Sequence, residues 1–491
     1  MSDAFDRTGR FLATLSEDPN ALADRMAHMQ VEILAPSLDA ASEIAVALTA
    51  MLLLRLDRAA PTLFLNTPAT RIRTLPGLAD GDLLDALIHE HAGFRSAARF
   101  HRGSAPDPLL RIVCAGSDPG LRVSSAGWAL ALGTELDGVE GNPLAACFAA
   151  VLASAEALKA LLLATGIQSR RIRPWRGAIS LWDYSLSPTP GAAITEAVSL
   201  DGCAFAGAGG VASATGWALG LLPLAGTPHL VDDDHIDETN LNRHLTANHE
   251  DSGAAKVDLL GAVLEAAGAC PRVHVCRWDA VSEEIKHTTR LGVISVDDDA
   301  ARRAFQLDMP QWVLNGGTAD TGFYQVTSHD FLTDACLGCI AHGDQVSFGA
   351  EHSAARRLGL PRERLRGLIE RDDPLPDDIL ACLSAEDAAR LRGKSGRTIL
   401  RIACGELAPL PDAPAVSAPM LSAAPGVVLG AEIAKWGTTG QLGLRAPENA
   451  LNTSILSGPH KSWLWRRAKR PACTCTDESY RAFYRRRWTS Q

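Results

Sequence analysis

The chain has 491 residues, of which 46% are hydrophobic and 21% charged, and its formal net charge is −10. This length allows two or three domains with cores of their own. The acidic balance argues against non-specific nucleic-acid binding, which depends on neutralising phosphates. No stretch reads as long and uncharged enough to span a bilayer, and no basic start precedes an apolar run at the N-terminus. We therefore expect a cytoplasmic protein without a membrane or nucleic-acid partner.

The first 190 residues are rich in Ala and Leu and show helical periodicity. Two segments carry it, GDLLDALIHEHAGF and PLAACFAAVLASAEALKALLL. In the first of them, His89-Glu90-His91 lacks the spacing that puts two imidazoles on one helix face, so we expect a solvated helix surface there. The polar segment LSPTPGAAITEAVS that follows predicts a linker.

An alternating α/β pattern begins after this linker. A strand from Cys203 to Ala206 leads into a glycine turn and an apolar helix, and a second strand ends at Asp232. A helix near 254–267 and strands near 272–277 and 292–296 continue the alternation, which predicts a mainly parallel sheet. A Pro- and charge-rich stretch (345–420) interrupts the pattern. A helix near 426–435 resumes it, and the chain ends in a basic tail (465–491).

Two pairs of segments resemble each other. SAGWAL from Ser125 resembles SATGWAL from Ser213, and AEALK, which ends at Lys159, resembles AEIAK, which ends at Lys435. Their order predicts one α/β fold present twice: an inactive, adenylation-like domain (1–190) before an active one (195–491). The segment from Cys114 to Gly120 would then replace the glycine turn in the first copy. Chance similarity between Ala-rich helices would explain these pairs equally well.

The glycine turn reads Gly207-Ala-Gly209-Gly210. Glycine allows a tight turn and close approach of the backbone to phosphate, and the helix that follows presents free N–H groups. Asp232, at the end of the next strand, is placed to accept hydrogen bonds from ribose hydroxyls. NAD-dependent oxidoreductases share these features, so they do not separate ATP from NAD.

The residues that follow favour ATP. Asp234 precedes Asn240 and Arg243, and Lys256 comes thirteen residues after that arginine. Attack at the α-phosphate of ATP spreads negative charge that fixed cations stabilise, whereas hydride transfer needs no such set. Asp297 ends the strand GVISV, where α/β sheets place ligand groups, and its carboxylate suits a magnesium ion. The ordered set predicts an adenylating site.

Together the segments GAGGVAS, VDDDHIDETNLNRH, GAAK and VDDDAARR resemble the adenylation domain of ThiF, the molybdopterin-synthase adenylyltransferase and the ubiquitin-activating enzymes. The resemblance covers 195–345 strongly and 420–491 more loosely. It implies that ATP is contacted by Gly209, Asp232, Asn240, Arg243 and Lys256. It also implies that Asp234 lies nearby and that Asp297 binds Mg²⁺. Two positions depart from the family pattern: Ala212 replaces a frequent third glycine, and Asp298 replaces the Asn that usually follows the metal ligand.

Four cysteines fall in two close pairs. Cys336 and Cys339 are spaced as in zinc sites, whereas Cys473 and Cys475 are one residue closer than usual. Four thiolates would close a tetrahedral structural site for Zn²⁺. In the resembled family, zinc holds the segment after the sheet against the C-terminal tail. Two unrelated pairs are the alternative.

A further cysteine, Cys404, precedes a glycine inside the 345–420 stretch. A thiolate can capture an acyl adenylate as a thioester. Bacterial activating enzymes that this segment resembles carry Cys-Gly there, and they work beside a ubiquitin-like protein, a conjugating enzyme and a deconjugating protease in apparent antiviral operons. Cys382 is a rival nucleophile, and a buried small hydrophobe is the plain alternative. We expect the remaining thiols to pack in the core: Cys114, Cys147, Cys203, Cys270 and Cys276.

These expectations describe an enzyme that activates a ubiquitin-like protein with ATP and passes it from a thioester to a conjugating enzyme. A sulfur-carrier adenylyltransferase would use the same chemistry without the thioester. An NAD-dependent oxidoreductase and an inactive scaffold fit the Asn, Arg and Lys series less well. The sequence leaves open whether two chains associate or the N-terminal half forms an internal pseudo-dimer.

Overall fold

The structure is a computed structural model. It describes residues 7–13, 15–16, 18–92, 99–137, 142–167, 169–319, 322–340, 360–371, 373–381, 388–389, 391–394, 418–445, 447–471 and 473–488.

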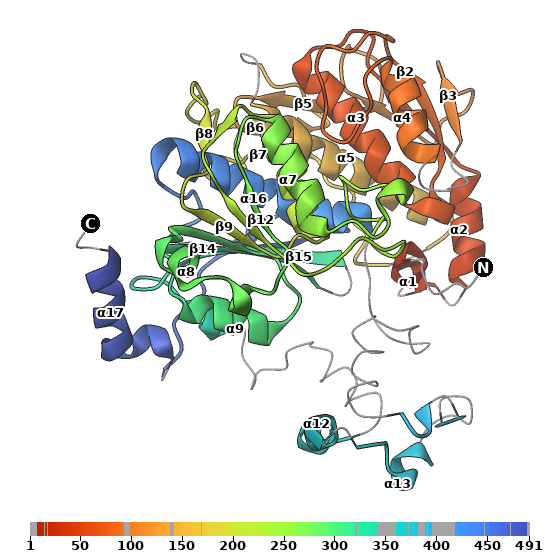
Figure 1. The fold of residues 1–491 in the computed structure, drawn as a ribbon. Helices are drawn as coiled ribbons and strands as arrows, with labels where there is room; N and C mark the ends of the chain where they lie inside the picture. The colour runs from red at the N-terminus through yellow and green to blue at the C-terminus, as the bar shows by residue number, and fades with distance from the viewer. Residues whose placement is uncertain are drawn as a thin grey trace.

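The first half of the chain folds around one sheet (Figure 1). Its elements are α1 (Arg7–Ala13), α2 (Pro19–Ala27), β1 (Gln30–Leu34), α3 (Ala40–Leu54), β2 (Thr62–Asn66), α4 (Leu83–Ala92), β3 (Phe100–Arg102), β4 (Leu110–Val113), β5 (Leu121–Ala126), β6 (Ala129–Leu132), α5 (Pro143–Ala164) and β7 (Gly177–Ser180). The strands lie in the order β3-β2-β1-β4-β5-β6-β7. The first five are parallel, and β6 and β7 pair antiparallel.

The second half contains a larger sheet. Its elements up to α9 are β8 (Val198–Ser199), β9 (Cys203–Ala206), α6 (Gly210–Leu219), β10 (Leu224–Ala225), β11 (His229–Val231), α7 (Lys256–Ala266), β12 (Arg272–His274), α8 (Glu283–Thr288), β13 (Leu291–Ile294) and α9 (Asp299–Leu307). The remaining ones are β14 (Trp312–Ala319), β15 (Phe323–Asp330), α10 (Leu337–Ile340), α12 (Arg362–Arg371), α13 (Asp377–Leu380), α16 (Pro419–Thr439), β16 (Ala450–Ser454), β17 (Leu464–Trp465) and α17 (Glu478–Trp488). The sheet order is β12-β11-β9-β13-β14-β15-β16-β17, while β8 and β10 form a separate pair.

The two sheets match strand for strand over seven positions. In both, five parallel strands are followed by two antiparallel ones, and the chain visits the positions in the same order. Helix α3 after β1 therefore corresponds to α6 after β9, and α5 before β7 corresponds to α16 before β16. The predicted α/β class with mainly parallel sheets is confirmed. That the first copy is inactive stays a prediction.

Of the two sequence resemblances, one lies on corresponding elements of the two halves and the other does not. Lys159 and Lys435 lie on the corresponding helices α5 and α16, each in a buried ion pair with a glutamate three residues earlier. The resemblance from Ser125 and Ser213 is wrong, because the first segment forms the hairpin of β5 and β6 and the second forms α6. The shared residues Gly-Trp-Ala-Leu lie in a strand pair in one half and in a helix in the other.

The proposed replacement for the glycine turn is also wrong. The segment from Cys114 to Gly120 follows β4, whose counterpart is β13 and not β9. The true counterpart of the turn lies between β1 and α3. There Asp39 caps the helix, since its Oδ1 accepts a hydrogen bond of 2.7 Å from the backbone N–H of Ser42. A carboxylate therefore fills the helix terminus that could otherwise receive a phosphate.

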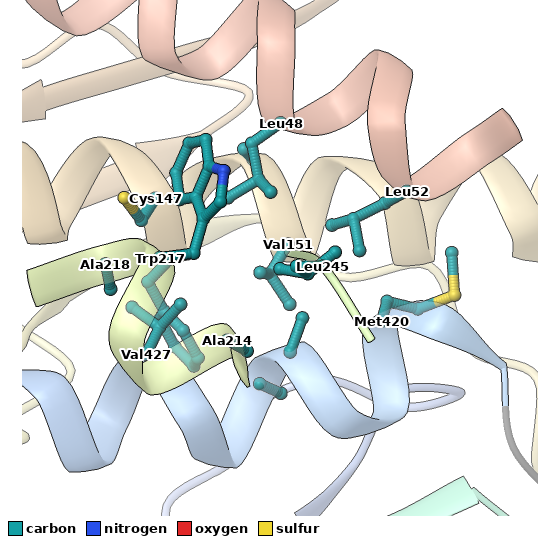
Figure 2. Packing of buried hydrophobic residues seen from close by; sticks show 14 of the residues in the cluster. Leu48, Leu52, Cys147, Val151, Ala214, Trp217, Ala218, Leu245, Met420 and Val427 are labelled. Atoms are coloured by element: carbon teal, nitrogen blue, oxygen red, sulfur yellow. The ribbon is translucent and has the colours of Figure 1, made fainter. Parts of the chain in front are cut away.

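Helices α3, α5, α6 and α16 join the halves. Figure 2 shows side chains of all four converging on one apolar layer, with the indole of Trp217 between α6 and the helices of the first half. The indole is fully buried, and its Nε1 donates a hydrogen bond of 2.8 Å to the carbonyl of Pro76. Gly426 lets α16 approach α6 closely, because a methyl group there would lie 2.6 Å from the carbonyl oxygen of Val211. The halves thus share one core.

Helix α5 contradicts the expectation that no stretch is long and uncharged enough to span a bilayer. In length and composition it satisfies the requirements of a membrane span, and 89% of its most apolar window is buried inside the protein. Its apolar surface is covered by α3 and α16, with which it shares the core between the two halves. Burial by the protein accounts for its composition.

Candidate nucleotide site and cysteine cluster

The glycine turn connects β9 to α6, and its three glycines differ in what they require. Gly207 has a φ of +96°, which favours glycine. A methyl group at Gly210 would lie 2.9 Å from Cγ of Arg243, so packing excludes a side chain there. Gly209, the N-cap of α6, has an ordinary φ of −73°, and a methyl group on it would meet no described atom within 4 Å. Neither backbone conformation nor packing explains Gly209.

Asp232 follows β11 and braces the turn. Its Oδ2 accepts a hydrogen bond of 2.5 Å from the backbone N–H of Ala208, and its Oδ1 accepts one of 2.8 Å from the N–H of Asp234. Burial raises the pKa of its carboxyl group, against the effect of these two hydrogen bonds and of Lys256. The carboxylate therefore holds the turn in shape, and its contact with a ribose stays a prediction.

The loop from Asn240 to Ala247 lies against the turn. The carbonyl of buried Asn240 accepts hydrogen bonds of 3.0 Å from the N–H groups of Arg243 and His244. Nη1 of Arg243 donates to the carbonyl of Thr239 at 2.7 Å. The N–H of Leu245 donates to Oγ of Ser213 on α6 at 3.1 Å. The loop is thus folded on itself and fastened to the first turns of α6.

His244 joins the loop to the glycine turn. Its Nε2 lies 3.0 Å from the carbonyl oxygen of Ala208, which can only accept, so this nitrogen carries the proton. Burial, helped by the nearby charges of Lys256, Arg55 and Arg243, lowers the pKa of His244 to about 3, against the effect of the hydrogen bond to Ala208. The imidazole is therefore neutral at pH 7. Of the three cations near it, Arg243 and Lys256 lie close to the glycine turn, and this arrangement suits an anionic ligand.

Lys256 is the first residue of α7 and is 8% exposed. Its Nζ lies 2.7 Å from Oδ2 of Asp234, whose side chain is 67% exposed. An ammonium has three donor hydrogens, so this pairing leaves donors for a phosphate oxygen. Lys256, Arg243 and Asn240 thus lie near the glycine turn, and their contact with ATP stays a prediction.

Asp297 lies beyond the end of β13 and is exposed. The preceding residues touch the glycine turn, because Oγ of Ser295 donates to the carbonyl of Gly207 at 3.3 Å and a methyl group on Gly207 would lie 3.0 Å from Val296. A separate group, Asp232 to Asp234, brings its carboxylate oxygens within 4.8 Å of one another, and only its last two residues are exposed. Magnesium binding by Asp297 stays a prediction.

The four paired cysteines lie together in the second half, beside Phe331 and Tyr484. The Sγ atoms of Cys336 and Cys339 are 3.9 Å apart, those of Cys336 and Cys473 3.5 Å, and those of Cys339 and Cys475 3.4 Å. Four sulfurs placed about 2.3 Å from one ion at tetrahedral corners would be about 3.8 Å apart. A disulfide would need about 2.05 Å. The cluster therefore fits a zinc ion, and the short Cys-Thr-Cys spacing does not prevent it.

The cluster fastens the C-terminal helix α17 to the sheet. The ring of Tyr484 stacks on Phe331 beside the thiols, and its hydroxyl donates to the carbonyl of Gln311 at 2.5 Å. Nε1 of Trp488 donates to the carbonyl of Met309 at 2.9 Å. Much of the attachment of α17 thus consists of contacts next to the cysteines.

The predictions for the other cysteines have mixed outcomes. Three are buried as expected, namely Cys114, Cys147 and Cys203, and burial raises the pKa of each. Core packing is wrong for two others, since Cys270 is exposed and Cys276 partly exposed at the edge near β12. Cys404 and Cys382 lie outside the described residues. The choice between them stays a prediction.

Sequence reasoning missed two contributors to the site. His244 directly follows Arg243 in the same loop, and this position was a usable signal. Glu90 was expected on a solvated surface, but it is 7% exposed and forms an ion pair with Arg55, which is 1% exposed. No local pattern identifies this pair, because its surroundings come from both halves of the chain.

No protein-family model matches the sequence. The uncharacterized protein y4jF of Sinorhizobium fredii (strain NBRC 101917 / NGR234) is 24% identical over 337 residues, covering 63% of this chain and 63% of the relative. E. coli MccB with MccA-N7isoASN aligns at 13% identity and a TM-score of 0.36, over 56% of this chain and 66% of that one. E. coli MccB with AMPCPP and MccA aligns at 14% identity and a TM-score of 0.36, with the same coverage of both chains. Less than two thirds of each of these proteins is spanned, and likeness this distant transfers no substrate or partner.

Proposed function

We propose that this chain uses ATP to adenylate the C-terminal carboxylate of a ubiquitin-like protein. The acyl group then moves to Cys404 as a thioester and on to a conjugating enzyme. The first half of the chain takes the place of a second subunit, as an internal pseudo-dimer. A sulfur-carrier adenylyltransferase, which would stop before the thioester, is the second candidate within the same chemistry.

The observation that carries the proposal is the setting of Gly209. The backbone there needs no glycine and the protein leaves space for a side chain, yet the residue is bare at the N-terminus of α6. Close approach of a phosphate to the backbone accounts for this, because helix N-termini favour anions. Arg243 and Lys256 lie at the same edge, and a site for hydride transfer has no need of them.

The proposed chemistry follows from these positions. A carboxylate oxygen of the ubiquitin-like protein attacks the α-phosphorus of ATP, and the bond from phosphorus to the bridging oxygen breaks. The electron pair leaves with pyrophosphate, and the product is a mixed anhydride of the carboxylate with AMP. Arg243 presents a planar fork and Lys256 a compact charge to the phosphate oxygens, which stabilises the charge as it spreads. Magnesium bound by Asp297 would neutralise part of the triphosphate charge.

In the second step the Cys404 thiolate attacks the acyl carbon of the anhydride. AMP leaves, and the new bond is a thioester. The proposal also places a zinc ion in the cluster of Cys336, Cys339, Cys473 and Cys475, where it would be structural, since four thiolates leave no open position for a reactant.

Isotope exchange between ATP and pyrophosphate tests the first step. With a ubiquitin-like protein as acceptor, the wild-type chain should catalyse the exchange. Arg243→Ala and Lys256→Ala should each lower it by about a hundredfold or more, since each removes charge stabilisation from the transition state. Arg58→Ala is the matched control, because Arg58 is exposed and its ion pair is with Asp24 on α2 of the first half. Exchange that survives in both variants would refute their roles.

A further inference from the structure

One arginine of the first half reaches the loop that carries Asn240 and Arg243. We propose that Arg55 is a positioning residue of the nucleotide site, and that its ion pair with Glu90 lets the first half hold this loop in the geometry that presents Arg243. The inference rests on the proposed function and adds a role for the first half of the chain.

The contacts of Arg55 converge on the backbone of the loop. Its Nη1 donates to the carbonyl of Leu241 at 2.8 Å and to that of Ala247 at 3.4 Å. Its Nη2 donates to the carbonyl of Leu245 at 3.3 Å and to that of Ala247 at 3.4 Å. The three carbonyls flank Arg243 on both sides in the chain, so one guanidinium sets the path of the backbone around it.

The pair is anchored within the first half. Arg55 is the C-cap of α3, Glu90 lies on α4, and Nη2 of Arg55 bonds directly to Oε1 of Glu90. Both side chains are almost fully buried. Glu90 therefore balances the guanidinium charge without any contribution from the loop, and the carbonyl contacts are available to order the loop.

On its other face the loop bonds to the glycine turn and α6. His244 donates to the carbonyl of Ala208, and the N–H of Leu245 donates to Ser213. The loop is thus held between α6 and Arg55. Loss of the Arg55 contacts would leave buried carbonyls without their donors and free one face of the loop to move.

Arg55 acts through the loop and not on the substrate. It is 1% exposed and lies at the junction of the halves, so it cannot reach a phosphate. Its loss should therefore disorder Arg243 while leaving the charge of Arg243 and Lys256 in place. The expected signature is a raised KM for ATP together with a lowered kcat, because misplacing a catalytic group by about 1 Å costs up to about a hundredfold.

The test uses the full chain with both members of the pair removed, Arg55→Met with Glu90→Gln, so that no unpaired charge stays buried. Arg58→Met with Asp24→Asn is the control, since that pair is exposed. We measure ATP–pyrophosphate exchange, and hydrogen–deuterium exchange of the amides of Arg243, His244 and Ala247, which are hydrogen-bonded within the loop. If Arg55 holds the loop in place, the variant with Arg55→Met and Glu90→Gln should show at least about tenfold lower kcat/KM for ATP and faster deuterium uptake. The control variant should show neither change.

Arg55→Lys serves if the double variant does not fold. A single ammonium keeps the charge beside Glu90 but cannot span three carbonyls as a planar fork does, so deuterium uptake in the loop should rise while the melting temperature stays near that of the wild type. Wild-type uptake and wild-type kinetics in either variant would overturn the inference. If the wild-type chain lacks ATP–pyrophosphate exchange, the proposed function fails, and the deuterium measurement still decides whether Arg55 orders the loop.

Discussion

Gly209→Ala separates the requirements of the ligand from those of the fold. The backbone at this residue has φ −73° and ψ −163°, and the added methyl group would meet no described atom within 4 Å. The folded chain can therefore accept alanine without moving. If phosphate approaches the bare Cα, however, the methyl group occupies the space that the phosphate needs.

The two effects on stability are small and opposite. Alanine restricts the unfolded chain and so stabilises the protein by about 0.4–1 kcal/mol. As an N-cap it is poorer than glycine by roughly 0.5 kcal/mol. The free energy of unfolding should thus change by less than about 1 kcal/mol. A nucleotide displaced by about 1 Å would lose about a hundredfold in rate, which corresponds to about 2.7 kcal/mol.

Urea unfolding measures the first quantity, and calorimetric titration with a non-hydrolysable ATP analogue together with ATP–pyrophosphate exchange measures the second. Gly210→Ala is the comparison, because its methyl group would lie 2.9 Å from Cγ and 3.0 Å from the carbonyl oxygen of Arg243. That variant should lose stability as well as activity. Wild-type nucleotide binding by Gly209→Ala, or a loss of several kcal/mol in its stability, would refute the reasoning.

His244 should make the protein acid-sensitive. Its pKa in the folded protein, about 3, lies below the ordinary value of 6.5, so the unfolded chain binds more protons between these two pH values. The free energy of unfolding therefore falls as the pH drops below 6.5, and at pH 5.5 it should be about 1.4 kcal/mol lower than at pH 7.5. His244→Gln keeps a donor for Ala208 and should lower this slope, and parallel urea-unfolding profiles of the two proteins between pH 7.5 and 5.5 would contradict it. Zinc analysis should find about one ion per chain, lost with Cys336→Ser, together with release of α17; a stable, metal-free wild type would exclude the site. Cys404→Ala should retain adenylation but lose the thioester that reducing agents cleave on a gel, whereas a persisting thioester would move the nucleophile to Cys382.

Much of the second half could be predicted because its signals are local. A short apolar strand, a glycine turn and an apolar helix adjoin each other in sequence, so β9 and α6 follow from the pattern around Gly207. The cysteine pairs were equally local, and their convergence required only that the tail return to α10.

The first half was harder to read, because its sheet lacks the glycine turn. Only the AEALK and AEIAK segments pointed to the duplication, and these hold because Glu156 and Glu432 pair with lysines on corresponding helices. The burial of Glu90 escaped prediction for a different reason. Its partner Arg55 and the loop carbonyls that share this partner are distant in sequence, so only the packed structure makes a charged residue a core residue.

The matching strand order of the halves has an evolutionary consequence. In an assembly of identical subunits every substitution occurs at each equivalent place. Here the N-caps of α3 and α6 are specified by separate codons, and one is Asp39 while the other is Gly209. Selection can therefore alter the N-cap of α3 without altering that of α6, and an inherited change in the glycine turn acts once per molecule.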